Sequence, residues 1–112
     1  MEANVLHNVL SNTFNPNQQI QQQSELDLKQ LSSQPGFVVL LLQTVMANQV
    51  PHPIRMAAVI YLKNFVQQKW RENHISDQDK QFVKQNILQA IVHAPQQLKY
   101  VFCYVASHVY II

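Results

Sequence analysis

The sequence predicts an all-α protein built of stacked helical hairpins. Glycine is nearly absent, with Gly36 the only one in 112 residues, whereas turns between strands usually need glycine. Pro16, Pro53 and Pro95 lie 37 and 42 residues apart, and each opens the second helix of a predicted pair. Two-helix repeats of about 40–47 residues are typical of HEAT and armadillo proteins, whereas tetratricopeptide repeats need about 34. We therefore expect an α-solenoid of about three HEAT-type helical hairpins.

The first predicted hairpin occupies about residues 3–32. Its first helix covers about residues 3–13 and carries the apolar stripe Val5, Leu6, Val9 and Leu10. Asn15 is the expected cap of the second helix and Pro16 its first residue, because a missing N–H costs nothing there. This helix continues through a glutamine-rich stretch to about Leu31, where the run Ser32-Ser33-Gln34-Pro35-Gly36 ends it.

The second predicted hairpin occupies about residues 36–70. Its first helix ends near Asn48 and carries Phe37, Leu40, Leu41 and Val45 at helical spacing. Its second helix begins at Pro53 and ends at about Trp70.

The third predicted hairpin occupies about residues 76–111. Its first helix, about 77–93, follows Ser76, which with Asp79 resembles a capping box. Ala94-Pro95 starts the last helix, whose apolar residues recur at helical spacing: Leu98, Val101, Phe102, Val105 and Val109.

Residues 105–112 are almost wholly apolar, whereas a terminal solenoid repeat carries a polar outer face. We therefore expect the chain to be part of a longer solenoid, or its last helix to pack on a partner. Self-association through that helix is a further prediction. Burial against the preceding helix is the alternative, and it explains part of the stripe but not Ile111 and Ile112 together.

Composition and charge argue against several classes of protein. The formal net charge is +2 without any basic run, which gives little support to direct nucleic-acid binding. The most apolar run, about residues 37–46, is shorter than the roughly 20 residues needed to span a bilayer. Cys103 is the only cysteine, so no internal disulfide forms and a reducing compartment fits.

Residues for catalysis or for a cofactor are not grouped in this sequence. None of the five histidines lies three or four residues from another, so we expect no metal site. Cys103 and His108 are five residues apart on one helix, which aligns them poorly as a dyad. Gly36 alone cannot form a phosphate-binding loop. We therefore expect no cofactor, no catalytic residue and no enzyme activity.

The segment at residues 51–70 carries a resemblance to a known family. It reads PHPIRMAAVIYLKNFVQQKW: a proline turn, an arginine, small residues, a Tyr-Leu-Lys-Asn core and a closing tryptophan. With residues 24–37, 75–80 and 94–95, it resembles the N-terminal domain of the importin-β (karyopherin-β) superfamily over nearly the whole chain. The likeness is greatest to the importin-seven and importin-eight branch, and the cellular-apoptosis-susceptibility exportin is the near rival. Three tyrosines make the last helix more aromatic than the family pattern: Tyr100, Tyr104 and Tyr110.

This resemblance implies a superhelix of HEAT repeats whose second helices line the concave face. It also implies that the N-terminal repeats bind the small GTPase Ran in its GTP state. It further implies import of protein cargo and shuttling between cytoplasm and nucleus through the nuclear pore, with nucleoporins and cargo bound beyond these repeats. An exportin of the same superfamily, or a HEAT scaffold with no GTPase partner, remains the alternative.

The helix of the Tyr-Leu-Lys-Asn core carries the candidate Ran contacts. On a helical wheel, the predicted core stripe is Ile54, Ala57, Ala58, Tyr61, Leu62 and Phe65. The opposite side carries four candidates for Ran contact: Lys63, Asn64, Gln67 and Arg71. A cation there pairs with acidic partner groups, and the amides suit exposed backbone, although a solvated polar face is the alternative. Arg55 opposes the helix dipole, so we expect a structural hydrogen bond to the preceding turn or to a neighbouring hairpin.

Overall fold

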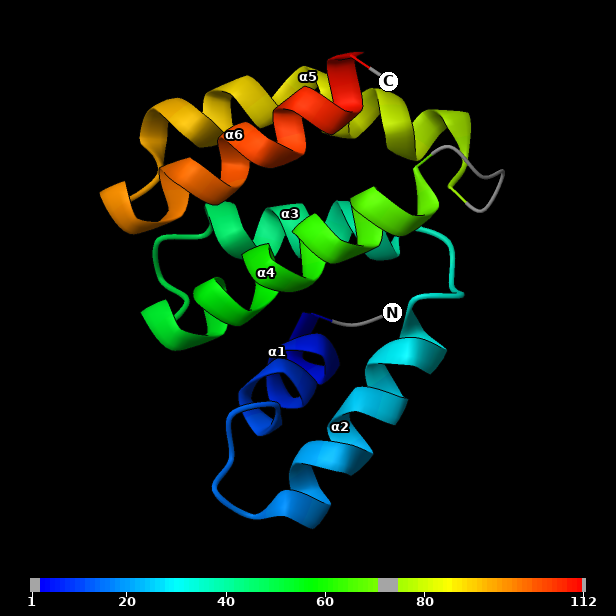
Figure 1. Cartoon of the computed structure of the whole chain (residues 1–112), viewed down its shortest axis with the longest axis vertical. Helices are drawn as coiled ribbons and strands as arrows, with labels where there is room; N and C mark the ends of the chain where they lie inside the picture. Colours follow the sequence, from blue (N-terminus) through cyan, green and yellow to red (C-terminus); the bar gives the residue numbers. More distant parts are fainter. Residues whose placement is uncertain (1–2, 71–74, 112) are drawn as a thin grey trace.

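The chain folds as a stack of helices, seen in a computed structural model that describes residues 3–70 and 75–111 (Figure 1). Within those ranges there are six helices and no strand, which confirms the predicted fold class. The helices are α1 (Ala3–Asn12), α2 (Gln18–Leu31), α3 (Phe37–Met46), α4 (His52–Lys69), α5 (Asp77–His93) and α6 (Gln96–Ile111). None of these helices is long and apolar enough to cross a membrane.

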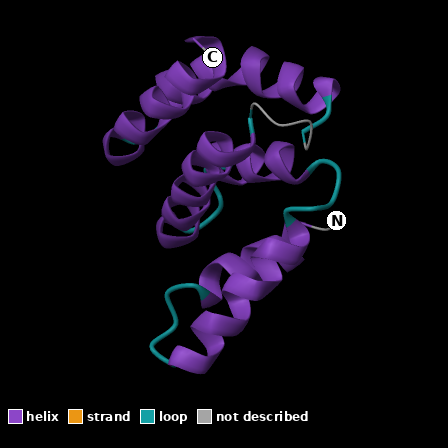
Figure 2. Cartoon of the chain, turned by 45° about the vertical axis from the view of Figure 1, so that its right-hand side comes forward, coloured by secondary structure: helices purple, strands orange, loops and turns teal. Residues whose placement is uncertain are grey.

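Helices that are adjacent in the chain form three hairpins, α1–α2, α3–α4 and α5–α6 (Figures 1 and 2). The second and third hairpins stack in register, because α3 packs on α5 and α4 packs on α6. The first hairpin joins differently: α1 packs on both α4 and α3, while α2 packs chiefly on α1. As a result α2 diverges from α4 instead of running beside it (Figure 1).

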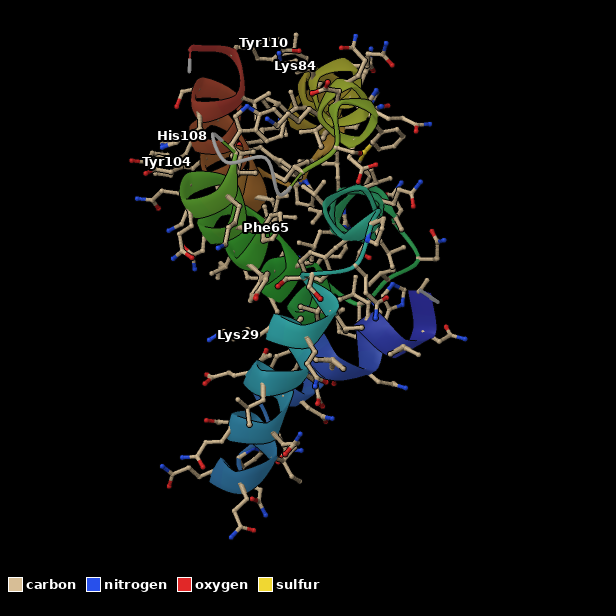
Figure 3. All side chains as sticks on the ribbon, turned by 90° about the vertical axis from the view of Figure 1, so that its right-hand side faces the viewer. Lys29, Phe65, Lys84, Tyr104, His108 and Tyr110 are labelled. Atoms are coloured by element: carbon tan, nitrogen blue, oxygen red, sulfur yellow. The ribbon has the colours of Figure 1, made fainter. Side chains whose placement is uncertain are left out.

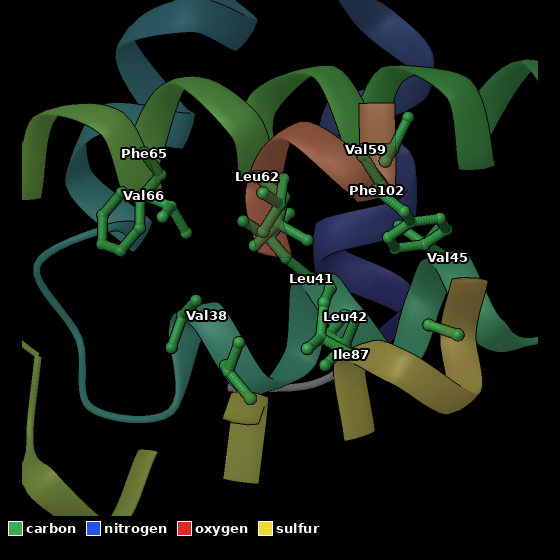
Figure 4. Close-up of a cluster of buried hydrophobic side chains, with 14 of the residues drawn as sticks. Val38, Leu41, Leu42, Val45, Val59, Leu62, Phe65, Val66, Ile87 and Phe102 are labelled. Atoms are coloured by element: carbon green, nitrogen blue, oxygen red, sulfur yellow. The ribbon is translucent and has the colours of Figure 1, made fainter. Parts of the chain in front are cut away.

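One core runs through the stack: it lies between the second and third hairpins (Figure 4) and includes Leu6, Leu10 and Leu28 of the first. Helix α3 is apolar on nearly every side because α1, α4 and α5 all contact it. Phe37, at its start, meets Tyr61 and Phe65 edge-on, with ring centroids 5.8 and 5.3 Å apart. The buried cluster drawn in Figure 4 includes Val38, Leu41, Leu42, Val45, Val59, Leu62, Phe65, Val66, Ile87 and Phe102.

The structure corrects the predicted start of α2. Asn17, not Asn15, caps the helix, because its side-chain oxygen accepts hydrogen bonds from the N–H groups of Gln19 and Ile20. The Asn15 side chain instead accepts from the Asn17 N–H, which holds the turn before the helix. Pro16 therefore precedes the helix and is not its first residue.

Two other helix limits differ from the prediction by one or two residues. Helix α3 ends at Met46, because Ala47 has extended backbone angles, and not near Asn48. Helix α4 begins at His52, which places Pro53 in its first turn as a residue that needs no N–H partner.

The start of α5 is tied to the loop between α2 and α3. Ser76 caps α5 as predicted, since its hydroxyl oxygen accepts from the Asp79 N–H at 3.1 Å. The reciprocal half of a capping box is absent, because the Asp79 carboxylate accepts from the Gly36 N–H at 3.0 Å. Gly36 has φ of 82°, a left-handed conformation that glycine adopts readily.

The apolar stripe of α6 is buried within the chain. Leu98, Phe102, Val105 and Val109 are covered by α4 and α5, which is the alternative that the sequence left open. Self-association through this helix rests also on Ile111 and Ile112, and it stays a prediction. The Ile111 side chain and Ile112 lie outside what the structure describes.

Candidate partner-binding surface

Helix α4 is buried over a wider arc than one stripe. Ala58, Leu62 and Phe65 are buried as predicted, whereas Ile54, Ala57 and Tyr61 are only half-buried. Val59 and Val66 are buried too, and the helical wheel assigned neither to the core. The reason is that α4 packs against α3, α6 and α1 at once, so different sides of it are covered by different hairpins.

Arg55 makes a structural hydrogen bond as expected, but its partner lies in α3 of the same hairpin, not in the preceding turn or a neighbouring hairpin. Its guanidinium is buried in the α3–α4 hairpin, and its Nε donates to the Val45 carbonyl oxygen at 2.8 Å. That carbonyl lies in the last turn of α3, where no further helical N–H is available to it. Arg55, in the first turn of α4, therefore satisfies a carbonyl at the end of α3.

Tyr61 joins α4 to the loop after α2. Burial raises the pKa of its phenol above the ordinary 10.0, and a side-chain hydrogen bond with Ser32 offsets part of that rise. The ring also lies edge-on against Phe37. Tyr61, in the Tyr-Leu-Lys-Asn core, thus packs within the middle hairpin and lines the space toward the first hairpin.

The candidate contact residues do not all face the same neighbours. Lys63 is half-buried beside α6, and its Nζ lies 5.8 Å from the centroid of the Tyr104 ring. Asn64 and Gln67 are exposed on α4. Arg71 lies outside the described residues. Lys63 therefore adjoins α6, whereas Asn64 lines a groove toward the first hairpin.

Asn64 borders a groove that sequence reasoning missed. The groove lies between α4 and the first hairpin, has a volume of about 760 Å³ and is mostly apolar. Leu10 of α1, Phe14 of the following turn and Leu28 of α2 line one side of it. Met56, Ile60 and Tyr61 of α4 line the other. The groove exists because α2 diverges from α4, an angle between hairpins that no local sequence pattern encodes.

Tyr104 and His108 complete the second side of the surface (Figure 3). Their rings are 4.6 Å apart between centroids and inclined by 34°. Both belong to α6, one helical turn apart, and Tyr104 is 39% exposed. Sequence reasoning noted Tyr104 as an aromatic residue of the last helix. It did not connect Tyr104 to Lys63, which lies 41 residues earlier in the chain.

A metal site would need several His, Cys, Asp or Glu side chains close together. Among the residues that the structure describes, no three of His, Cys, Asp and Glu lie close enough to hold a metal ion. Cys103 is exposed and free. The α4–α6 face instead carries lysine and amide side chains beside aromatic rings, residue types that are common in protein interfaces.

Helical hairpins stacked in this way define an α-solenoid of the HEAT type. Residues 24–93, well over half of the chain, match the importin-beta N-terminal domain family. The chain belongs to that family.

Some of the relatives are named for import and others for export. The chain is 30% identical over 110 residues to importin-8 of Danio rerio, an alignment that covers 88% of the chain and 10% of the relative. It is 30% identical over 80 residues to the importin alpha re-exporter of Saccharomyces cerevisiae, covering 68% of the chain and 8% of that protein. It is 28% identical over 95 residues to exportin-2 of Oreochromis niloticus, covering 80% and 10%. The chain thus spans about a tenth of the length of these curated relatives.

Proposed function

We propose that the chain is the GTPase-binding end of a nuclear transport receptor and that it binds Ran in its GTP state. The observation that carries the proposal is the second-helix face of α4, where the Tyr-Leu-Lys-Asn core of the family places Lys63, Asn64 and Gln67 outside the core. Arg71 belongs to the same proposed contact, although it lies outside the described residues.

The charge of this face supports a partner with acidic groups. Neither α4 nor α6 contains an aspartate or a glutamate. Their charged residues are all cationic: Arg55, Lys63, Lys69 and Lys99. Since Arg55 is buried, Lys63 is the cation nearest the candidate amides, and complementary charge favours both specificity and rapid association.

The wider role follows from this proposal. As part of a receptor, the chain shuttles between cytoplasm and nucleus, takes part in protein import, and has no enzyme activity of its own. Nucleoporins and cargo bind parts of the receptor outside these hairpins. Export is the second candidate, because the chain matches relatives named for export in addition to relatives named for import.

The test is the affinity of the chain for Ran loaded with a non-hydrolysable GTP analogue or with GDP, measured by isothermal titration calorimetry. We expect binding to the GTP form, and we expect Lys63→Ala to weaken it by about three- to tenfold, as for a partly exposed interface cation. Lys84→Ala is the matched control, because Lys84 is an exposed lysine on α5, outside the proposed surface (Figure 3).

Each outcome separates the candidate functions. Equal affinity for both nucleotide states, or none, would contradict the proposal and leave a HEAT scaffold without a GTPase partner. Loss of affinity in Lys84→Ala equal to that in Lys63→Ala would show that overall charge, and not this face, determines binding.

A further inference from the structure

We propose that Tyr104 is a positioning residue for Lys63, and that Lys63, Tyr104 and His108 form one contact patch that receives an acidic loop of the GTPase. This inference rests on the proposed function and extends the contact surface from the second hairpin to the third. It joins Lys63 to Tyr104, 41 positions later in the chain, which only the stacking of α4 on α6 brings close.

The geometry gives Lys63 a fixed place. Its ammonium lies over the Tyr104 ring at 5.8 Å from the centroid, within the range of a cation–π contact. The ring in turn stacks on His108 at 4.6 Å, and His108 lies on the same helix one turn later. A lysine side chain otherwise loses much rotamer freedom when it binds, so a side chain held beforehand binds at a lower entropic cost.

The ammonium remains available to a partner. A ring contact occupies one side of the group and uses none of its three N–H donors in a hydrogen bond. Because α4 and α6 carry no carboxylate, no acidic side chain of these two helices competes for it. A carboxylate that approaches from solvent therefore meets a positioned ammonium.

The aromatic rings add contact area beside the cation. Tyr104 is 39% exposed, and its ring lies beside both Lys63 and His108. Rigid aromatic rings with an adjacent cation are typical of protein interfaces, where tyrosine gives large contact area with few rotatable bonds. The patch therefore fits a loop that presents a carboxylate to Lys63 and apolar atoms to Tyr104.

A pair of substitutions separates the ring from the hydroxyl. Tyr104→Leu removes the ring, and Tyr104→Phe keeps it. We expect Tyr104→Leu to weaken binding of GTP-form Ran about two- to fivefold, as for loss of one exposed cation–π contact, and Tyr104→Phe to leave it unchanged. The Lys63 side-chain CH₂ signals beside the ammonium, observed by ¹H–¹³C NMR, should lie upfield in wild type and in Tyr104→Phe and return to ordinary positions in Tyr104→Leu.

Two further measurements test the role and the chemistry. Tyr100→Leu removes an exposed tyrosine of the same helix that makes no recorded contact with Lys63, so it should cost less affinity than Tyr104→Leu. Binding should weaken as salt is raised, and it should weaken less steeply for Lys63→Ala, because one charge pair is missing.

Failure of the inference is distinguishable from failure of the proposed function. If wild type binds GTP-form Ran and Tyr104→Leu binds equally well, the inference is wrong and the proposed function stands. Equal losses in Tyr100→Leu and Tyr104→Leu, or Lys63 signals unmoved by Tyr104→Leu, also overturn the positioning role. If wild type does not prefer the GTP form, both proposals fall together.

Discussion

The Asp79 carboxylate accepts a hydrogen bond from the Gly36 N–H at 3.0 Å, which joins the loop between α2 and α3 to the first turn of α5. The two residues are 43 positions apart. Gly36 lies where the chain leaves the first hairpin and enters the second, and Asp79 lies in the third. The bond therefore contributes to how the hairpins are held together, beyond the apolar core.

Removal of this carboxylate should destabilise the fold measurably. We expect Asp79→Ala to lower the free energy of unfolding by about 1–2 kcal/mol more than Asp77→Ala, because a hydrogen bond to a charged group is lost. Asp77 is the matched control, since both acids lie in the first turn of α5 and both interact with its dipole. Urea unfolding followed by circular dichroism gives both values, and equal losses would mean that the bond to Gly36 contributes nothing.

Gly36 itself should resist substitution for a backbone reason alone. Its φ of 82° is unfavourable for other L-residues, yet a Cβ placed there meets no atom within 4 Å. Gly36→Ala should therefore cost about 1–2 kcal/mol through backbone strain. Gly36→Asn should cost less, because asparagine tolerates this conformation better. Urea unfolding of the two variants checks this order. If Gly36→Asn loses as much unfolding free energy as Gly36→Ala, or more, backbone strain is not the cause.

Arg55 should be structural in solution as well. Arg55→Met leaves the Val45 carbonyl at the end of α3 without its 2.8 Å partner, in a buried setting. We expect a loss of about 1–3 kcal/mol in unfolding free energy. Lys84→Met, a cation-to-methionine change at an exposed site, should stay within about 0.5 kcal/mol of wild type. If Arg55→Met leaves the unfolding free energy unchanged, the Val45 carbonyl finds another hydrogen-bond partner.

The partly buried phenol of Tyr61 should make the folded protein less stable at high pH. Burial raises the pKa of its phenol in the folded state above 10.0, so folding favours the neutral form. Its contribution is therefore fully present below about pH 10 and is lost as the pH rises through the folded pKa. Absorbance at 295 nm, compared between wild type and Tyr61→Phe, isolates this titration. A difference curve with its midpoint at or below 10.0 would contradict the burial effect.

Much of the fold was predictable because its signals are local. Apolar residues at helical spacing and the scarcity of glycine indicate helices, and the recurrence of proline indicates hairpins of HEAT length. The start of α2 was misplaced because Asn15 and Asn17 both suit a cap, and only the hydrogen bonds of Asn17 decide between them. The repeat limits 3–32, 36–70 and 76–111 stay a prediction.

The surface was less predictable because it depends on packing between hairpins. The wheel separated Lys63, Asn64 and Gln67 from Leu62 and Phe65, which follows from the period of the helix alone. It missed the burial of Val59 and Val66, since that comes from packing on more than one neighbouring helix. The contact of Lys63 with Tyr104 and the groove beside Asn64 both depend on how hairpins are oriented, which one helix does not encode.

The proposal that the α4–α6 face binds GTP-form Ran is tested most directly by NMR titration of the isotope-labelled chain. With Ran bound to a non-hydrolysable GTP analogue, we predict amide shifts that concentrate at Lys63, Asn64, Gln67 and Tyr104, and much smaller shifts with the GDP form. Shifts that concentrate on α3 and α5, or that are the same for both nucleotides, would contradict the proposal.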